Sequence, residues 1–545
     1  MPTLKINKEE FEDLLGEEIS EEQLHEEASY LGAHWNHEDG KKWEVETYPN
    51  RPDLLSVEGL ARAYKGFFDV ETGLRDYRTR QGITEVNVDE SVEQVRPYIG
   101  GAVIRDVELT PRIINGLIQL QEKLHQTVGR RRDKIAIGLH DLDSVEPPFT
   151  YKAVEPEQVS FTPLEYGEEI HLEEILNEHD KGQEYAWILE DEEKFPIISD
   201  SDGKILSFPP IINNQLTEVT SETTDIFIDV TGKHKETVLK VVNILVTALA
   251  ERDGKIETVR IDNDHMPLLE PEEVELDVEY FRSVSGLELE KEEIVDRLEQ
   301  MRFKAKKKKD KIKVGVPSYR TDVMHQYDII EDIVIAHRYN NIEPEMPELD
   351  TPANEKQIEE HTEELRDILQ GTGALESHTF TLSSKEKLFD RMNRKAEDEV
   401  VEMSNALTED YTVVRNQMLP TMMEVLQNNR QHSYPQRFYE IEDVALPREN
   451  DAENRRKLAY AISGPETDFT DIKQVLQVIE RDTGFDLEVE EAEKRFYRED
   501  RAAKIIYKGE TVGHIGELGE EVLANWELEQ RTAALELDVE KLYQN

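Results

Sequence analysis

The fold class is indicated most clearly by the stretch DIFIDVTGKHKETVLKVVNILVTALA (225–250). Residues 225–230 read as a strand bounded by polar residues. The helix predicted to follow carries an apolar stripe formed by Val238, Val241, Val242, Leu245 and Leu249. A strand followed directly by a helix is typical of a sheet covered by helices, so we expect an α/β (α+β) fold for this part of the chain.

Strand and helix patterns continue on both sides of this stretch over the whole chain. Because domains typically comprise ~100–200 residues, the 545 residues predict a multidomain protein. We place an N-terminal α/β domain at 1–85, the α/β unit around the quoted stretch at 86–265, a smaller unit at 266–348 and a mixed helix and strand domain at 349–545. Only 37% of the residues are hydrophobic, but their helix and strand periods indicate folded domains rather than disorder.

The charge of the chain is strongly acidic. There are 120 Asp plus Glu against 65 Lys plus Arg, a formal net charge of −55. The excess is spread along the chain, which indicates a solvated acidic surface rather than a charged interaction tail. Such surfaces suit a cytoplasm at very high salt, where charges are screened within ~3 Å at 1 M. We therefore expect a halophilic, haloarchaeal protein; the alternative is an ordinary acidic one.

Several classes of protein are excluded by what the sequence lacks. There is no cysteine, so thiol catalysis, disulfides and cysteine-type zinc sites are excluded. No stretch approaches the ~20 apolar residues of a membrane span, and the N-terminus has no signal-peptide core. No Gly-rich phosphate loop, HExxH motif or serine elbow is present. We expect a cytoplasmic protein that is neither a P-loop enzyme nor a common hydrolase.

Four carboxylates flank the start of a helix predicted near residue 326, namely Asp322, Asp328, Glu331 and Asp332. Glu331 follows Asp328 by one helical turn, so the two side chains can share a face. Clustered carboxylate oxygens suit Mg²⁺. Acidic residues near a helix N-terminus are also favoured by the helix dipole, and spacing alone favours that second interpretation.

A lysine-rich run, KAKKKKDKIK (304–313), stands out in this acidic chain. It could approach phosphates, but a solvated hairpin is the more common meaning of such a run.

Polar residues bracket the strands predicted in the 86–265 unit, namely His140, Asn213, Asn214, Thr217 and Asp229. They could line a pocket that positions a water molecule. Turn formation and capping explain most Asn, Thr and Asp residues near strand ends, and the residues alone favour that explanation.

Three groups of motifs resemble the beta subunits of phenylalanine–tRNA ligases. NRPDLLSVEGLARA (50–63) resembles their N-terminal signature, and PSYRTDVMHQYDIIEDIVIAHRYNNI (317–342) resembles their B5 domain. IGLHDLD (137–143) and FPPIINNQLTEVTSETTDIFIDVTG (208–232) resemble the B3/B4 editing domain of the archaeal and eukaryotic branch. The resemblance covers essentially the whole chain in the expected order.

The resemblance implies a subunit that works with a catalytic alpha subunit, in an assembly of two alpha and two beta chains. Such enzymes use ATP to attach phenylalanine to tRNA(Phe). The family's Mg²⁺ ligands, shared with alpha, lie at positions that match Asp322, Asp328, Glu331 and Asp332. All four positions are acidic here, so the resemblance strengthens the metal interpretation.

The resemblance also implies that the domain at 349–545 is a class II synthetase-like domain that has lost its chemistry. A working domain of this class needs an arginine-bearing motif to hold ATP. The corresponding segment, GHIGELGEE (513–521), has Glu520 and Glu521 instead, and Arg415 and Arg437 are the motif-like arginines upstream. We therefore expect no catalytic residue for aminoacylation in this chain. The extra RNA-binding modules of bacterial members are not recognised, which fits the archaeal branch.

Editing would be the hydrolysis of tyrosine mistakenly attached to tRNA(Phe). Because an apolar pocket rejects an added hydroxyl only weakly, a second site that recognises the hydroxyl is physically reasonable. The candidate residues for this pocket are Asn213, Asn214, Thr217 and Asp229. Two other functions stay open, a stand-alone editing hydrolase and a non-enzymatic tRNA-binding adaptor.

Overall fold

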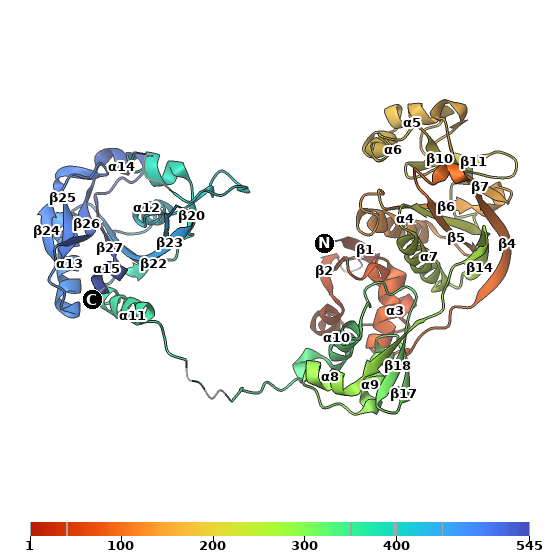
Figure 1. Cartoon of the computed structure of the whole chain (residues 1–545), viewed down its shortest axis with the longest axis horizontal. Helices are drawn as coiled ribbons and strands as arrows, with labels where there is room; N and C mark the ends of the chain where they lie inside the picture. The colour runs from red at the N-terminus through yellow and green to blue at the C-terminus, as the bar shows by residue number, and fades with distance from the viewer. Residues whose placement is uncertain are drawn as a thin grey trace. The chain divides into compact units, whose positions relative to one another are not determined.

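The computed structural model describes residues 2–39, 42–348, 351, 353–395, 400–449 and 451–543. The chain forms two compact units, Met1–Glu345 and Met346–Asn545 (Figure 1). No helix within the described ranges is long and apolar enough to cross a membrane.

The N-terminal segment and the segment from 272 to 337 each form a three-stranded antiparallel sheet with helices. The first sheet has the order β1-β3-β2 and the second β16-β18-β17. The elements of the first segment are β1 (Thr3–Asn7), α1 (Lys8–Leu15), α2 (Glu21–Glu27), β2 (Ala33–Asp39), β3 (Lys42–Thr47) and α3 (Val57–Phe67). Those of the second are β16 (Glu272–Asp277), α8 (Val278–Ser285), α9 (Lys291–Gln300), β17 (Lys304–Lys308), β18 (Lys311–Val316) and α10 (Gln326–His337).

These two segments, although more than 200 residues apart in the sequence, share one hydrophobic core. Phe11, Trp43 and Tyr64 of the first segment belong to the same buried cluster as Leu298 and Ile329 of the second. The signature helix α3 begins at Ser56, whose hydroxyl accepts a hydrogen bond from the Gly59 amide at 3.1 Å, as an N-cap should.

The central unit is built on a mixed ten-stranded sheet. The strand order is β12-β11-β10-β7-β4-β14-β5-β13-β6, and β15 pairs with β14. Its strands are β4 (Thr79–Val88), β5 (Tyr98–Arg105), β6 (Ile135–Asp141), β7 (Phe149–Val154), β10 (Phe195–Ser199), β11 (Ile205–Phe208), β12 (Ile212–Asn213), β13 (Ile226–Gly232), β14 (Lys255–Ile261) and β15 (Asp264–Met266). Two pairings, β4–β14 and β4–β7, are parallel, and the others are antiparallel.

Helices pack against both faces of this sheet. Helix α4 (Pro111–Gln126) and helix α7 (Lys235–Ala250) bury their apolar stripes in one core with strands β5, β6 and β13 (Figure 1). Helices α5 (Leu172–Glu178) and α6 (Asp180–Tyr185) contribute residues to a second core with β7, β10 and β11.

The C-terminal unit is a seven-stranded sheet with helices on both faces. The strand order is β19-β22-β23-β27-β26-β25-β24, antiparallel except for β19 beside β22. Its strands are β19 (Leu375–Glu376), β22 (Gln436–Pro447), β23 (Ala452–Ser463), β24 (Glu488–Glu491), β25 (Tyr497–Tyr507), β26 (Glu510–Leu518) and β27 (Thr532–Asp538). Helices α11 (Gln357–Gln370) and α13 (Phe469–Thr483) share one core with the sheet, and α12 (Leu419–Asn428) and α14 (Glu520–Asn525) share another.

Candidate functional site

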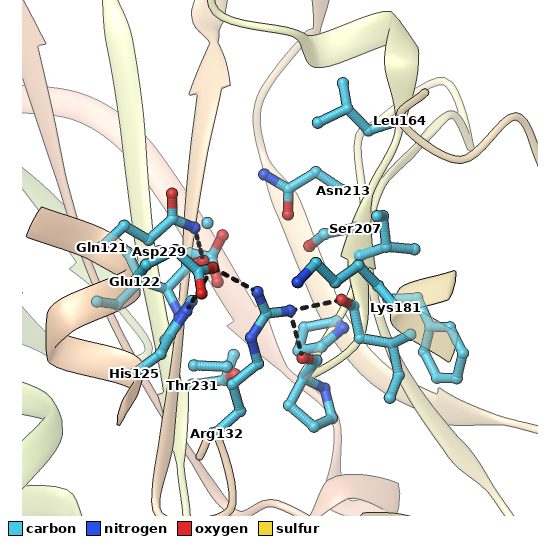
Figure 2. Close-up of a pocket in the computed structure, with 18 of the residues that line it drawn as sticks. Gln121, Glu122, His125, Arg132, Leu164, Lys181, Ser207, Asn213, Asp229 and Thr231 are labelled. Atoms are coloured by element: carbon cyan, nitrogen blue, oxygen red, sulfur yellow. Dashed lines mark hydrogen bonds and ion pairs between the residues drawn. The ribbon is translucent and has the colours of Figure 1, made fainter. Parts of the chain in front are cut away.

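A cavity of about 240 Å³ lies in the central unit, between α4 and strands β6, β11, β12 and β13 (Figure 2). Pockets for drug-sized ligands usually measure about 300–1,000 Å³, so this cavity suits a single amino-acid side chain better than a whole nucleotide. Its polar lining residues include Gln121, Glu122, His125, Arg132, Ser207, Asn213, Asp229 and Thr231. Its apolar wall is the run Phe208–Ile212 with its two prolines, the run that stood out in the sequence.

Asp229 is the buried carboxylate of this cavity, with 2% of its surface exposed. The strand register places it opposite Gly138 of β6 and Gly101 of β5. A Cβ atom at Gly138 would lie 2.0 Å from the Asp229 Oδ2 atom, so only glycine leaves room for this carboxylate. The glycine in the strand IAIGL thus has a direct role in shaping the site.

His140 holds the Asp229 carboxylate in place. Its Nε2 atom lies 2.8 Å from Asp229 Oδ2, and its Nδ1 atom lies 2.8 Å from the Thr217 hydroxyl. The Nε2–H can donate to Asp229, while Nδ1 pairs with the Thr217 hydroxyl. Thr217 and His140 are fully buried and do not line the cavity, so they position Asp229 from behind.

The opposite wall presents Ser207 and Asn213, which pair across strands β11 and β12 (Figure 2). The Ser207 hydroxyl is buried and has no hydrogen-bond partner among the described residues. Asn213 donates from Nδ2 to the Leu139 carbonyl at 3.3 Å, which leaves its side-chain oxygen available. A buried hydroxyl without a hydrogen-bond partner lowers stability unless a ligand or water molecule bonds to it. This wall is therefore suited to binding a polar ligand.

Glu122, His125 and Arg132 form a charged group at one side of the cavity (Figure 2). Arg132 donates to Glu122 Oε1 at 2.8 Å and to the Ile211 carbonyl at 2.8 Å, so it ties α4 to the proline-rich wall. His125 lies with Nδ1 3.5 Å from the same carboxylate oxygen, and its hydrogen bond and Arg132 lower the pKa of Glu122 to about 2. Burial lowers the pKa of His125 to about 4, so its neutral Nε2 accepts the Ile137 amide at 2.9 Å.

The four predicted pocket residues occupy different places. Asn213 and Asp229 line the cavity. Thr217 does not line it, but its hydroxyl contacts His140, which in turn contacts Asp229. Asn214 instead stabilises the turn, since its side chain donates to the Ile205 carbonyl and accepts from the Leu216 amide. Ser207, Glu122 and Arg132 also line the cavity, and none of them was predicted. The first directly precedes the double-proline run, and Glu122 precedes His125 by three positions on α4.

Of the four predicted metal ligands, three line one cavity and Asp328 does not. Asp322 and Asp332 are both paired with the buried Arg320, each at 2.6 Å from its Nη2. Asp328 accepts the backbone amides of Met324 and His325 at 2.8 Å each, so it caps helix α10. Glu331 is exposed and lines a cavity of about 370 Å³ together with Asp322, Asp332 and Arg51. Within the described ranges, no three His, Asp or Glu side chains are arranged to hold a metal ion.

Two of the sequence motifs, at 50–63 and 317–342, meet at this place. Arg51 makes a bidentate pair with Asp53 at 2.8 Å and lies 3.9 Å from Asp322. The Arg62 guanidinium stacks 3.6 Å from the centre of the Tyr319 ring. Segments 50–63 and 317–342 therefore form one joint, in which buried arginines neutralise the carboxylates.

The comparisons with known proteins fit this architecture. The beta subunit of phenylalanine–tRNA ligase from Pyrococcus horikoshii is 39% identical over 559 residues, covering all of both chains, and that from Archaeoglobus fulgidus is 39% identical over 549 residues, covering 100% of this chain and 99% of the relative. The crystal structure of an N-terminal fragment of the P. horikoshii phenylalanyl-tRNA synthetase beta subunit superimposes with a TM-score of 0.60 at 40% identity, covering 62% of this chain and all of the fragment.

The chain belongs to the phenylalanine–tRNA ligase beta subunit family. Residues 103–245 match the B3/4 domain, residues 274–339 the tRNA synthetase B5 domain and residues 342–539 the phenylalanyl tRNA synthetase beta chain CLM domain. The B3/4 domain is the editing-type domain, and it contains most of the 240 Å³ cavity. The B5 match contains the joint with Arg320 and its carboxylates.

The lysine-rich run of this family member forms the hairpin β17–β18, as its simpler interpretation predicted. Its lysines pair with glutamates of neighbouring elements: Lys307 with Glu292, and Lys308 and Lys311 with Glu275. Four of the seven lysines, including Lys313 beside Glu273, therefore have a local acidic partner.

In the CLM domain, acidic residues engage the buried cations of the sheet. Arg415 is fully buried and donates to Glu440 at 2.8 Å, and Lys457 donates to Glu536 at 2.8 Å. Glu536 also accepts the backbone amides of Met418 and Leu419 at the start of α12. Burial raises the pKa of Glu536, but Lys457 and these donors outweigh it and lower the pKa to about 2. A carboxylate thus occupies the helix N-terminus that could otherwise bind an anion.

Proposed function

We propose that this chain is the non-catalytic partner in charging tRNA(Phe) with phenylalanine and the editing subunit of the same enzyme. A separate alpha subunit performs the ATP-dependent aminoacylation in the cytoplasm, within an assembly of two alpha and two beta chains. The names of the full-length relatives support this role. The internal pairing of Arg415 and Lys457 supports the absence of ATP chemistry in this chain.

The editing reaction is assigned to the cavity of the B3/4 domain. Water adds to the ester carbonyl of tyrosyl-tRNA(Phe), the bond to the terminal ribose breaks, and tyrosine and the ribose hydroxyl are released. The observation that carries this proposal is the buried Asp229 carboxylate, held by His140 on the wall of a cavity of side-chain size.

Asp229 accepts the phenolic hydroxyl of tyrosine in this proposal. Phenylalanine has no hydroxyl and would exclude water from the carboxylate without supplying a second donor beside His140, a loss that discriminates between the two amino acids. Ser207 and Asn213 orient the ester and the attacking water from the opposite wall. Asn214 and Thr217 support these groups from the turn and from behind His140.

Magnesium is proposed as a cofactor of the assembled enzyme. The carboxylates of this chain do not form a complete metal site by themselves. Asp322 and Asp332 are paired with Arg320, and Asp328 accepts a backbone amide at the N-terminus of helix α10. The proposed editing reaction does not use the metal ion in any step.

Life at high salt is proposed from the composition. A net charge of −55 distributed over the chain is the supporting observation. Salt screens the repulsion within such a surface, which makes a halophilic source the consistent interpretation.

The division of labour is tested by pyrophosphate exchange and deacylation. The purified chain alone should form no phenylalanyl-adenylate, whereas co-expression with the alpha subunit should restore charging. The assembled enzyme should hydrolyse tyrosyl-tRNA(Phe) at least about a hundredfold faster than phenylalanyl-tRNA(Phe), the range expected for a site that reads a hydroxyl. Equal rates would reject the editing assignment, and adenylate formation by the chain alone would reject the non-catalytic role. Failure to co-purify with an alpha subunit would favour a stand-alone hydrolase or a tRNA-binding adaptor.

A further inference from the structure

The turn GRRRDK (129–134) joins α4 to β6 beside the editing cavity and has an unusual backbone. Three consecutive arginines, Arg130, Arg131 and Arg132, have φ angles of 48°, 56° and 67°. Left-handed conformations of non-glycine residues cost ~1–2 kcal/mol each and persist only where the surroundings impose them. Contacts with the surrounding structure must therefore hold this backbone in place, and its conformation indicates a functional role.

The structural cause is a set of hydrogen bonds below the turn. The buried Arg96 donates to the carbonyls of Arg132 and Asp133 at 3.0 Å each, and to the Thr231 carbonyl at 3.1 Å. The Lys134 amide closes the turn on the Gly129 carbonyl at 2.9 Å. Arg132 reaches into the cavity wall and pairs with Glu122 (Figure 2). The turn is thus fixed to strand β13 and to the cavity at once.

Arg130 and Arg131 point a different way. Both are exposed, and neither forms an ion pair with any residue that the structure describes. Arg130 and Arg131 directly precede the cavity-lining Arg132 in the sequence. Because consecutive Cα atoms are ~3.8 Å apart, both residues lie close to the cavity. Asp133, the acidic residue of the turn, is already paired with Lys233 at 2.7 Å. The pair of arginines is therefore a local excess of positive charge in a chain whose net charge is −55.

An exposed aromatic ring lies beside this turn. The Arg131 guanidinium is 6.0 Å from the centre of the Trp187 ring, and Trp187 is 46% exposed. The other three tryptophans, Trp35, Trp43 and Trp526, are at least 92% buried. One residue along, Arg132 stacks 4.3 Å from the Tyr185 ring, so the turn and the segment 185–187 are packed side by side at the cavity.

We propose that Arg130, Arg131 and Trp187 bind the single-stranded 3′ end of the aminoacylated RNA. This proposal rests on the editing function, because a tyrosyl group in the cavity brings the ribose and the last phosphates to its rim. Arginines bind phosphates through paired donors, and exposed aromatic rings stack on unpaired bases of any sequence. The strained turn holds the two guanidinium groups on the side where the nucleic acid enters. These three residues recognise the phosphates and the base surfaces of the RNA, while the cavity recognises the attached amino acid.

The test measures binding of an uncharged acceptor-stem hairpin RNA to the full chain, in KCl concentrations at which circular dichroism shows the fold unchanged. Arg130→Ala with Arg131→Ala should weaken binding about tenfold. The slope of log K against log salt should fall by about 1.4, since each single-strand phosphate contact contributes ~0.7. The control is Arg78→Ala with Arg80→Ala, two exposed arginines of the same domain that do not line the cavity, and it should bind as the wild type does.

Trp187 provides a second, independent readout. The hairpin should quench its fluorescence, and Trp187→Leu should remove the quench and weaken binding at least fivefold, because stacking of a base contributes ~1–3 kcal/mol. A hairpin without its single-stranded 3′ end should bind equally to the wild type and both variants. Unchanged affinity and salt slope in the double arginine variant, or equal weakening with the truncated hairpin, would overturn the proposal. Because the RNA is uncharged, these results do not depend on hydrolysis, and a failure of the editing function would be seen separately.

Discussion

At the residue scale, the cavity proposed for editing depends on the space left by one glycine. Gly138 faces Asp229 across two strands, and the carboxylate and His140 fill the volume that a methyl group would take. A sequence shows Gly138 only as a small residue within a strand pattern. Its meaning appears when the register of β6 against β13 is known.

Gly138→Ala is therefore expected to disable editing selectively. The new Cβ would lie 2.0 Å from Asp229 Oδ2 and 2.6 Å from His140 Nε2, so the carboxylate must move. We expect tyrosyl-tRNA hydrolysis to fall at least tenfold, with a stability loss of ~1–3 kcal/mol from overpacking, while charging with phenylalanine persists. The matched control is Gly116→Ala on α4, where nothing lies within 4 Å of the added atom. Equal hydrolysis rates in both variants would contradict this account of Asp229.

His125 should make the stability of the central unit depend on pH. Its pKa falls from 6.5 in the unfolded chain to about 4 in the folded protein, because burial opposes the charged form. The stability that this group contributes is therefore present above about pH 6.5 and is lost as the pH falls through 4. At ~1.4 kcal/mol per pKa unit, the loss amounts to about 3 kcal/mol.

The measurement compares the unfolding free energies of the wild type and His125→Gln between about pH 7 and pH 4, at constant salt. Glutamine can still accept the Ile137 amide but does not titrate in this range. The stability difference between the two proteins should change by about 3 kcal/mol in favour of the variant as the pH falls. Parallel curves would show that His125 is not held neutral by the fold.

The residues of the cavity were only partly predictable from the sequence. Asn213 and Asp229 were found because polar residues at strand ends are visible in a sequence. Ser207 lies inside an apolar strand and Glu122 on a helix far away in sequence, and their approach to Asp229 depends on long-range strand order. Nothing local distinguishes Asn213, which faces the cavity, from Asn214, which holds the turn.

At the scale of elements, local patterns predicted strands and helices well but not their arrangement. The strand predicted at 225–230 and the helix predicted to follow it are present, at 226–232 and 235–250. The mixed strand order of the central sheet was not, because it depends on pairings between strands that are far apart in the chain. The lysine-rich run shows the same limit, since only the structure reveals its glutamate partners.

A substitution in helix α10 distinguishes two roles for Asp328, that of a helix cap and that of a metal ligand. Because its carboxylate accepts two backbone amides at the helix start, Asp328→Ala should lower stability by ~1 kcal/mol without changing the Mg²⁺ dependence of charging. Glu331→Ala, on the exposed face of the same helix, serves as the companion variant and should leave stability unchanged. Both properties are read from denaturant unfolding and from Mg²⁺ titration of the assembled enzyme. A shifted Mg²⁺ requirement at unchanged stability would make Asp328 a ligand.

At the scale of the whole molecule, the domains predicted at 1–85 and 266–348 share a core. Each has a small three-stranded sheet, and small sheets bury too little surface to be stable alone. Their union around Phe11, Trp43, Leu298 and Ile329 explains why the motifs at 50–63 and 317–342 meet at Arg51, Arg320 and Asp322. Contacts of this kind leave no periodic signal in the sequence.

Salt should control folding and assembly. At 0.01 M salt the Debye length is ~30 Å, so the charge of −55 repels itself across a whole domain, whereas at 1 M it is ~3 Å. We expect the chain to unfold or leave the alpha subunit in dilute buffer and to be stable in molar KCl. tRNA binding by the assembled enzyme should also depend on salt less steeply than usual, because screening of the acidic surface offsets the loss of phosphate contacts. Circular dichroism and binding between about 0.2 and 3 M KCl test this. A folded assembly at low salt whose affinity falls steeply as salt rises would refute the halophilic interpretation.

We propose above that Asp229 lets this subunit remove tyrosine from tRNA(Phe). The most direct measurement is the hydrolysis of tyrosyl-tRNA(Phe) and phenylalanyl-tRNA(Phe) by the assembled enzyme carrying Asp229→Ala, beside its rate of charging. The account predicts that hydrolysis of the tyrosyl ester falls at least about a hundredfold, that the preference for tyrosine disappears, and that charging with phenylalanine stays within a few-fold of the wild type. Wild-type hydrolysis of tyrosyl-tRNA(Phe) by this variant, with its fold and charging intact, would contradict the account.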